Sequence, residues 1–177
     1  NSASETWEAN KTKNSKLTLL QQLNYLGKLD AQLPAPAHRV VYTKSGNTIA
    51  AATVSDDQAI IDHKLYWATT HTTDEADYLC TVLNSPLLSE RVRPMQAQGA
   101  FGPRDFDMYI WNLPIPEFNP RNGLHLELAA LGAQARAQAA DVNVDGMGFQ
   151  KARRQVRVAL ASLLHEADQL VPSLLTD

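Results

Sequence analysis

The stretch HRVVYTKSGNTIAAATV, residues 38–54, decides the fold class. Two runs that favour β-structure, at residues 40–43 and 48–54, flank the turn sequence Lys44-Ser45-Gly46-Asn47. This arrangement is typical of a β-hairpin, because glycine readily adopts the positive φ that a tight turn requires. A third run, AIIDHKLYWATT at residues 59–70, is β-branched and aromatic and predicts a further strand.

Helical patterns lie on both sides of these runs. Before them, Asn14 or Ser15 is expected to cap a helix. Its leucines, Leu19, Leu23 and Leu26, repeat at spacings of four and three. Pro34 and Pro36 are expected to end it. After them, Thr73 or Asp74 is expected to cap a second helix, with Pro86 near its end or at a kink. Its apolar face is predicted to contain Tyr78, Leu79, Val82 and Leu83.

The proline-rich stretch WNLPIPEFNP, residues 111–120, precedes two more helical patterns. Trp111, Leu113 and Ile115 alternate as in a strand, so we expect them to pack inward while the prolines stop strand pairing. In the last segment, apolar positions step by four and three, which is a heptad pattern (Val156, Leu160, Leu163, Ala167, Leu170, Leu174). We therefore predict an antiparallel helical hairpin after the proline-rich stretch.

Together these patterns predict an α+β protein: a small mixed or antiparallel β domain with flanking helices, followed by a C-terminal helical hairpin. The expected segments are a polar lead-in at residues 1–13, the α+β domain at 14–120 and the hairpin at 121–177. The first residue is Asn1 rather than methionine, and we expect the sequence to be a piece of a longer or processed chain.

Composition narrows the class of protein. A content of 44% hydrophobic and 20% charged residues is that of a globular protein, and no apolar run reaches the length of a membrane span. One cysteine excludes an internal disulfide and fits a reducing, cytoplasmic compartment. The net charge of -3 predicts weak non-specific phosphate binding, and residues 36–111 carry six Lys and Arg against nine Asp and Glu.

The sequence favours neither a metal site nor a catalytic centre. Residues 141–146, DVNVDG, begin like a calcium loop, but Ala152 stands where such a loop needs a bidentate glutamate, so a polar turn is the better interpretation. The histidines and Cys80 lack the spacing of a zinc site, and Cys80 is expected to be a small buried apolar residue. No nucleophile elbow, phosphate loop or Asn-Pro-Pro-aromatic methyltransferase motif occurs, so we expect no catalysis by this chain alone.

A glycine-containing loop combines arginines with side-chain amides: Arg91, Arg93, Gln96, Gln98 and Arg104. Arginine can bind guanine, and glutamine can bind adenine, through two hydrogen bonds in the DNA major groove. A solvated loop with scattered cations is the simpler alternative.

The order of motifs resembles the target-recognition regions of restriction-modification proteins. K-L-Y-W at residues 64–67 is followed by Y-L-x-x-x-L-N-S-P-L-L, then G-A-F-G-P-R, L-P-I-P and a long helix. The likeness covers residues 38–140 and is greatest to the C-terminal specificity domain of large N-6 adenine DNA methyltransferases, the TaqI-like specificity domain family. Type I specificity subunits show a looser version of the same layout.

The resemblance implies a domain that presents loops to the major groove of double-stranded DNA. It also implies an upstream methyltransferase domain in the same chain that binds S-adenosylmethionine, with no cofactor in this part. From the family and the residue chemistry together, the candidate DNA-binding residues are Lys44, Ser45 and Asn47 in the hairpin turn, with Arg91, Arg93, Gln96, Gln98 and Arg104 around the glycine loop. The alternative is a protein-interaction module, or a weak homodimer, that uses the heptad-patterned C-terminal helix.

Overall fold

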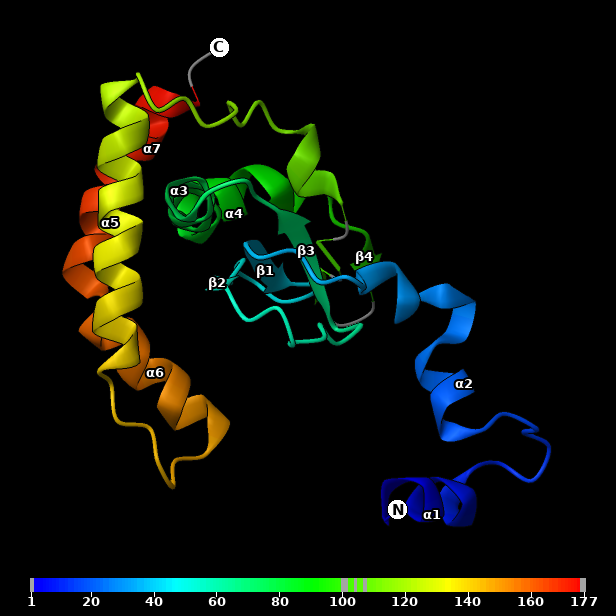
Figure 1. The fold of residues 1–177 in the computed structure, drawn as a ribbon. Coiled ribbons are helices and arrows are strands. Elements are labelled where there is room, and N and C mark those ends of the chain that lie inside the picture. Colours follow the sequence, from blue (N-terminus) through cyan, green and yellow to red (C-terminus); the bar gives the residue numbers. More distant parts are fainter. Residues whose placement is uncertain (1, 100–101, 104, 107, 176–177) are drawn as a thin grey trace. The chain divides into compact units, whose positions relative to one another are not determined.

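The computed structural model describes residues 2–99, 102–103, 105–106 and 108–175. The chain divides into two compact units: an N-terminal unit of residues 1–36 and 57–60, and a main unit of residues 37–56 and 61–177. The main unit combines helices with a small antiparallel sheet, so the α+β prediction is confirmed (Figure 1). Within the main unit the C-terminal helices pack together with the helix that follows the sheet.

The N-terminal unit consists of short helices. Residues expected as a polar lead-in contain α1 (Ser2–Asn10), which is followed by α2 (Leu19–Leu23) and the 3-10 helices η1 (Tyr25–Gly27) and η2 (Asp30–Gln32). The single helix predicted from residue 14 is therefore wrong in length. Leu26 and Gly27 have φ values of 58° and 70°, and two successive residues in the left-handed region turn the chain out of a helix.

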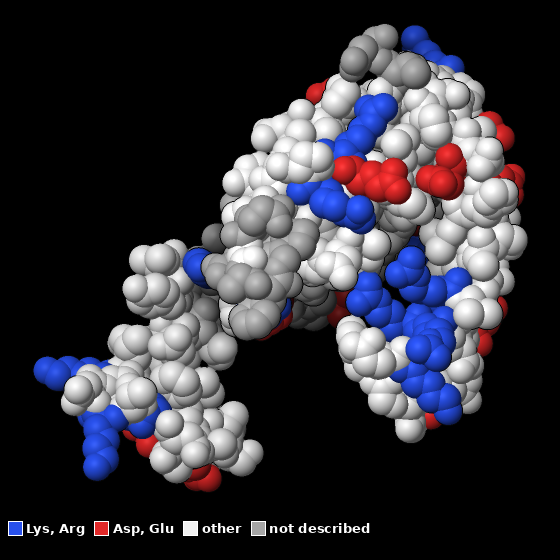
Figure 2. All heavy atoms as spheres, turned by 180° about the vertical axis from the view of Figure 1, so that it is seen from behind, with Lys and Arg blue, Asp and Glu red and all other residues white. Residues whose placement is uncertain are grey.

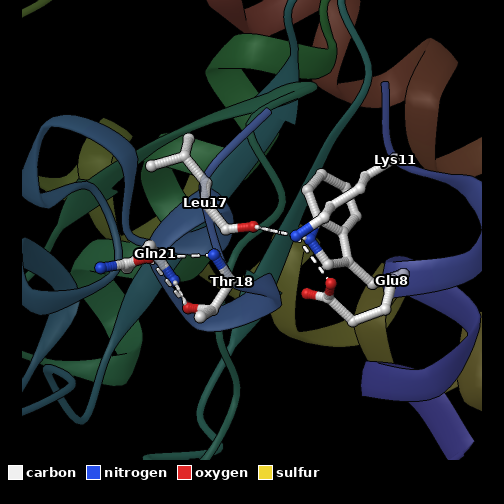
Figure 3. Close-up of polar contacts among 6 residues, drawn as sticks. Glu8, Lys11, Leu17, Thr18 and Gln21 are labelled. Atoms are coloured by element: carbon white, nitrogen blue, oxygen red, sulfur yellow. Dashed lines mark hydrogen bonds and ion pairs between the residues drawn. The ribbon is translucent and has the colours of Figure 1, made fainter. Parts of the chain in front are cut away.

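Two sets of side-chain contacts organise this unit (Figure 3). Thr18 and Gln21 form a capping box at the start of α2: the Thr18 N–H donates to Gln21 Oε1 at 2.9 Å, and the Gln21 N–H donates to Thr18 Oγ1 at 3.3 Å. Lys11 Nζ lies 2.6 Å from Glu8 Oε2 and also donates to the Leu17 carbonyl at 3.4 Å. The end of α1 is thereby tied to the residue that precedes the cap of α2.

The main unit is built on three antiparallel strands in the order β2-β1-β3: β1 (Arg39–Thr43), β2 (Ala51–Val54) and β3 (Leu65–Thr69). The predicted hairpin is confirmed, and Gly46 in its turn has a φ of 138°. The second strand begins three residues later than expected. The reason lies at Ile49, whose N–H donates to Ser89 Oγ at 3.0 Å.

Two consecutive helices follow the sheet, and α3 (Thr73–Asn84) lies between it and the C-terminal helices (Figure 1). Its cap is Thr72 rather than Thr73 or Asp74, since Thr72 Oγ1 accepts the Glu75 N–H at 3.1 Å. As expected, Pro86 follows the end of the first helix, and it also opens a new helix, α4 (Pro86–Val92). The predicted loop beyond it contains η3 (Arg93–Met95) and the short pair β4 (Gln98–Gly99) and β5 (Gly102–Pro103).

The Asn-Ser pair between α3 and α4 joins the helices to the sheet and to the last helix. Asn84 Oδ1 accepts the Ala51 N–H at 3.0 Å, and Asn84 Nδ2 donates to the Ala51 carbonyl at 2.9 Å. Ala51 belongs to the edge strand β2, so this amide satisfies backbone groups that have no strand partner there. Ser85 Oγ caps α4 through the Leu87 N–H and donates to Asp168 Oδ1 at 3.0 Å. The L-N-S-P motif is therefore structural.

The long helix α5 (Gly123–Ala140) is confirmed and crosses α3 closely. Gly132 is buried at this crossing, and Thr81 Oγ1 donates to the Leu128 carbonyl at 3.0 Å. One turn beyond the glycine, the Arg136 guanidinium forms two hydrogen bonds with the buried Asp77 carboxylate, at 2.9 and 2.8 Å. These hydrogen bonds raise the pKa of Arg136, which stabilises its charged form.

The last segment forms two helices, α6 (Phe149–Ala159) and α7 (Ala161–Leu174), rather than the single predicted one. The break is at Leu160, which has a ψ of 2°. The second helix buries Ala167, Val171 and Leu174 in the main unit, whereas no residue of α6 is buried. The heptad pattern therefore predicts core contacts correctly only in its second half.

The proline-rich stretch packs partly as predicted. Leu113 and Ile115 contact the core, as expected. Trp111 instead lies in the 3-10 helix η4 (Tyr109–Asn112) and remains 38% exposed. Its indole N–H donates to the Tyr42 hydroxyl at 3.1 Å. The Tyr78 hydroxyl donates to the Pro116 carbonyl at 2.9 Å. These contacts fix the stretch on the sheet at one end and on α3 at the other.

A buried histidine completes the attachment of this stretch to α5. His125 is 4% exposed, stacks on Tyr78 with ring centroids 4.9 Å apart, and accepts the Asn119 N–H at Nδ1, at 3.0 Å. Burial lowers the pKa of His125, so the folded state favours the neutral ring.

We expect this histidine to make stability depend on pH. Below the ordinary histidine pKa of about 6.5, the unfolded chain binds a proton that the folded chain resists, so stability falls as pH decreases from there. The variant His125→Gln is expected to flatten the dependence of the urea midpoint on pH between pH 5 and 7. The variant His165→Gln, at an exposed position of α7, is the control, and an equal flattening in both variants would contradict this role of His125.

Candidate nucleic-acid interface

The hairpin turn lies against the end of the glycine loop, although about sixty residues of sequence separate them. Ser45 forms an isolated antiparallel bridge with Asp105, and the Phe106 N–H donates to the Lys44 carbonyl at 2.7 Å. Lys44 Nζ lies 4.0 Å from Asp105 Oδ2, the outer limit of an ion pair. Backbone contacts thus bring together two of the regions that sequence reasoning singled out.

The turn presents polar groups to solvent. Ser45 and Asn47 are exposed, and the Lys44 side chain is 36% exposed. The Lys44 ammonium also lies 5.4 Å from the centre of the Tyr66 ring on β3, a cation–π contact that restricts the lysine. The turn therefore offers a hydroxyl, an amide and a positioned ammonium.

The remaining candidate residues have different surroundings. Arg91 is half-buried and donates from Nη1 to the Leu175 carbonyl at 3.0 Å, which gives it a structural contact at the end of α7. Arg93 is exposed on η3, whereas Gln96 is 4% exposed and is therefore closed to a DNA base. Gln98 lies in β4, and Arg104 lies outside the described residues. Of this group, Arg93 is the residue whose side chain the structure places at the surface.

The helix α6 carries a concentration of cations that sequence reasoning missed. Lys151, Arg153, Arg154 and Arg157 are all exposed, and they form the basic patch at the lower right of Figure 2, at the position of α6. The missed signal was local: residues 146–165 contain these four cations and no Asp or Glu. The heptad interpretation of the segment drew attention to its apolar residues instead.

A groove of about 410 Å³ separates α6 from the edge strand β2, and the basic patch of Figure 2 borders a hollow. Its floor and walls are mainly apolar, from residues such as Ile49, Ala51, Leu131, Val156 and Leu163. Three arginines, Arg136, Arg153 and Arg157, also line it. The groove therefore joins an apolar surface to positive charge.

Cys80 is also in this groove, but its chemistry is inert. Burial and the neighbouring Asp77 carboxylate raise the pKa of the Cys80 thiol to about 12. The thiol consequently stays protonated at neutral pH, when only a thiolate would act as a nucleophile. Within the described part of the chain, no three His, Cys, Asp or Glu residues gather as a metal site would require.

Among the described helices, none has both the length and the apolar character that crossing a membrane requires. No family model, curated protein or solved structure matches this chain.

Proposed function

We propose that this chain is the target-recognition part of an adenine-specific DNA methyltransferase, or of a fused restriction-methylation enzyme. In this proposal an upstream domain of the same protein binds S-adenosylmethionine and transfers the methyl group. The present chain selects the DNA sequence and supplies no catalytic group.

The observation that carries the proposal is the contact between the hairpin turn and the glycine loop. Residues 44–47 and 105–106 are joined by a strand-like bridge and a 2.7 Å backbone hydrogen bond. Sequence-specific readers present loops from a rigid scaffold, because base contacts need positions fixed to a fraction of an ångström. Here the turn extends directly from β1, whose Tyr42 is buried in the core.

The exposed groups also have suitable chemistry. An asparagine amide can form two hydrogen bonds with adenine, and lysine or arginine can donate to guanine O6 and N7. Asn47, Lys44 and the exposed Arg93 provide these donors and acceptors. The loss of one well-formed base contact typically weakens discrimination by about 1–3 kcal/mol, or about fivefold to 150-fold.

The test is selection from a randomised duplex library by the full chain, followed by the variant Lys44→Ala/Asn47→Ala. We expect the chain to enrich a short motif, and the variant to lose about tenfold or more of its preference for that motif over other sequences. Gln169→Ala, at an exposed position of α7, is the control and should keep the preference. Failure of the unaltered chain to enrich any motif would refute the proposed function.

The alternative, an interaction or dimerisation module built on the C-terminal helices, stays a prediction. Ala167 and Leu174, two positions of the heptad pattern, are already buried within the main unit. Sedimentation of the chain at several concentrations separates the proposals, since the dimer requires a mass that rises with concentration.

A further inference from the structure

We propose that α6 is a phosphate-binding helix that holds duplex DNA by its backbone, through Lys151, Arg153, Arg154 and Arg157. The choice of DNA as the polyanion rests on the proposed function. The site itself is assigned from the charge and exposure of α6, and it is separate from the turn and loop to which we assign base reading.

The charge distribution of the chain singles out α6. Residues 146–165 carry four cations and no acidic residue, while the rest of the chain carries 12 Lys and Arg against 19 Asp and Glu. None of the four forms an ion pair with another residue in the described ranges. Outside residues 146–165 the chain is thus net acidic, and α6 carries a compact basic surface, which is the electrostatic footprint of a nucleic-acid binder.

The stability of the fold does not account for these four cations. No residue of α6 is buried and all four cations are exposed, although Arg153 and Arg157 also border the apolar groove. Like charges three or four positions apart on a helix repel each other, and Lys151/Arg154, Arg154/Arg157 and Arg153/Arg157 have these spacings. The arrangement is therefore unfavourable in the free protein and becomes favourable when a polyanion neutralises it.

The spacing of the four cations on α6 also suits a row of phosphates. At 100° per residue the four side chains fall within one half of the helix circumference, and Lys151 and Arg157 are separated by about 9 Å along the axis. Duplex DNA presents one phosphate charge per roughly 1.7 Å of its axis, so this length faces about five charges. Three of the four cations are arginines, whose planar guanidinium groups match phosphate oxygens in pairs.

Hydrogen bonds also hold the helix in a fixed position. Gln138 Nε2 on α5 donates to the Ala159 carbonyl at 2.9 Å, at the end of α6. Gln155 Nε2 donates to the Asn143 carbonyl in the preceding connection at 3.2 Å. The basic surface is consequently presented in one orientation, as a positioning contact on DNA requires.

An anionic membrane is less suitable as the partner. A membrane-surface helix needs a broad apolar face turned outward. In α6, Val156 instead lines the groove beside β2, and Ala152 is half-covered. Phe149 and Val158 are exposed, so binding to lipid is kept as one outcome of the test.

The experiment measures binding of the full chain to a fluorescent duplex of arbitrary sequence over a range of salt concentrations. For Lys151→Gln/Arg153→Gln/Arg154→Gln/Arg157→Gln we expect affinity to fall at least tenfold at low salt. The slope of log K against log salt should decrease by about 0.9 for each phosphate that the variant no longer neutralises. A control removes the same number of charges elsewhere, through Lys13→Gln/Lys16→Gln/Lys28→Gln/Arg121→Gln, and should change both quantities much less.

Several outcomes overturn the proposal. If the control variant lowers the affinity and the salt slope equally, net charge alone accounts for binding. Tighter binding to phosphatidylserine vesicles than to DNA would make lipid the partner. If the glutamine variant fails to fold, the single variants Lys151→Gln and Arg154→Gln at exposed positions decide, since each should lower the salt slope by about 0.9 and an unchanged slope in both would refute the proposal. Sequence selection by the turn is measured separately, so an α6-dependent salt slope without motif enrichment would refute the proposed function and leave this inference standing.

Discussion

The variant Gly132→Val is expected to lower the free energy of unfolding by about 3 kcal/mol, at the upper end of the usual overpacking penalty. A Cβ atom at this position would lie 2.3 Å from the Asp77 carbonyl oxygen, 2.6 Å from Thr81 Oγ1 and 2.8 Å from the Asp77 carbonyl carbon. Two of these neighbours are backbone atoms of α3, which cannot rotate away as the tip of a side chain can. The helices α3 and α5 must therefore separate.

Separation of the helices has further consequences, because it stretches the Thr81 hydrogen bond to the Leu128 carbonyl and the Asp77–Arg136 pair. Even alanine, which gains about 1 kcal/mol over glycine inside a helix, is expected to destabilise here. Gly123→Ala in the same helix is the matched control, since nothing lies within 4 Å of its added Cβ. Urea unfolding measures the stability of the Gly132→Val, Gly132→Ala and Gly123→Ala proteins. A Gly132→Val protein as stable as Gly123→Ala would show that α3 and α5 do not cross tightly.

The sequence predicts the hairpin and the long helices well because their signals are local. Two β-branched runs around a glycine turn, and apolar residues spaced three and four apart, are properties of neighbouring residues. The sequence-based predictions fail where a contact with a residue far away in the sequence determines the local structure. The start of β2 is set by a hydrogen bond between Ile49 and Ser89, forty residues away. Asn84 bonds to the edge strand β2 as well as to Cys80 in its own helix.

The sequence predicts only part of the candidate site, because some of its features also depend on contacts between residues that are distant in the sequence. The turn residues Ser45 and Asn47 are exposed and Lys44 is partly exposed, as a hairpin turn requires, so local reasoning suffices for them. Gln96 has the chemistry of a base reader but is buried, and burial depends on the tertiary packing of the loop. The basic surface of α6 was visible as an acid-free stretch, but its exposure depends on α6 packing no side chain into the core.

The two proposals assign different energetic roles to the two surfaces. Phosphate contacts supply affinity that depends on salt but not on sequence, whereas base contacts supply discrimination. A chain with a net charge of -3 needs a localised basic surface for the first role, and α6 is the most concentrated one in the sequence. The turn can then select bases without having to provide most of the binding free energy.

Arg136→Met is the second substitution with a large expected effect, a loss of about 3 kcal/mol in the free energy of unfolding. The Asp77 side chain is 2% exposed, and without Arg136 its carboxylate would remain buried with its ion-pair partner gone. Removing one partner of a buried pair typically costs about 3–5 kcal/mol, and the lower end applies because the Arg136 side chain is 47% exposed and water weakens the attraction. Arg121→Met, at an exposed position before α5, should cost almost nothing.

A double-mutant cycle separates the ion pair from simple loss of packing. In the Asp77→Asn background no buried charge remains, so Arg136→Met should cost about 1–3 kcal/mol less than in the unaltered protein. Urea unfolding of the four proteins at pH 7 gives the coupling free energy directly. Equal losses in the two backgrounds would mean that Arg136 contributes only its apolar stem to the contact between α3 and α5, and that water already solvates the Asp77 carboxylate.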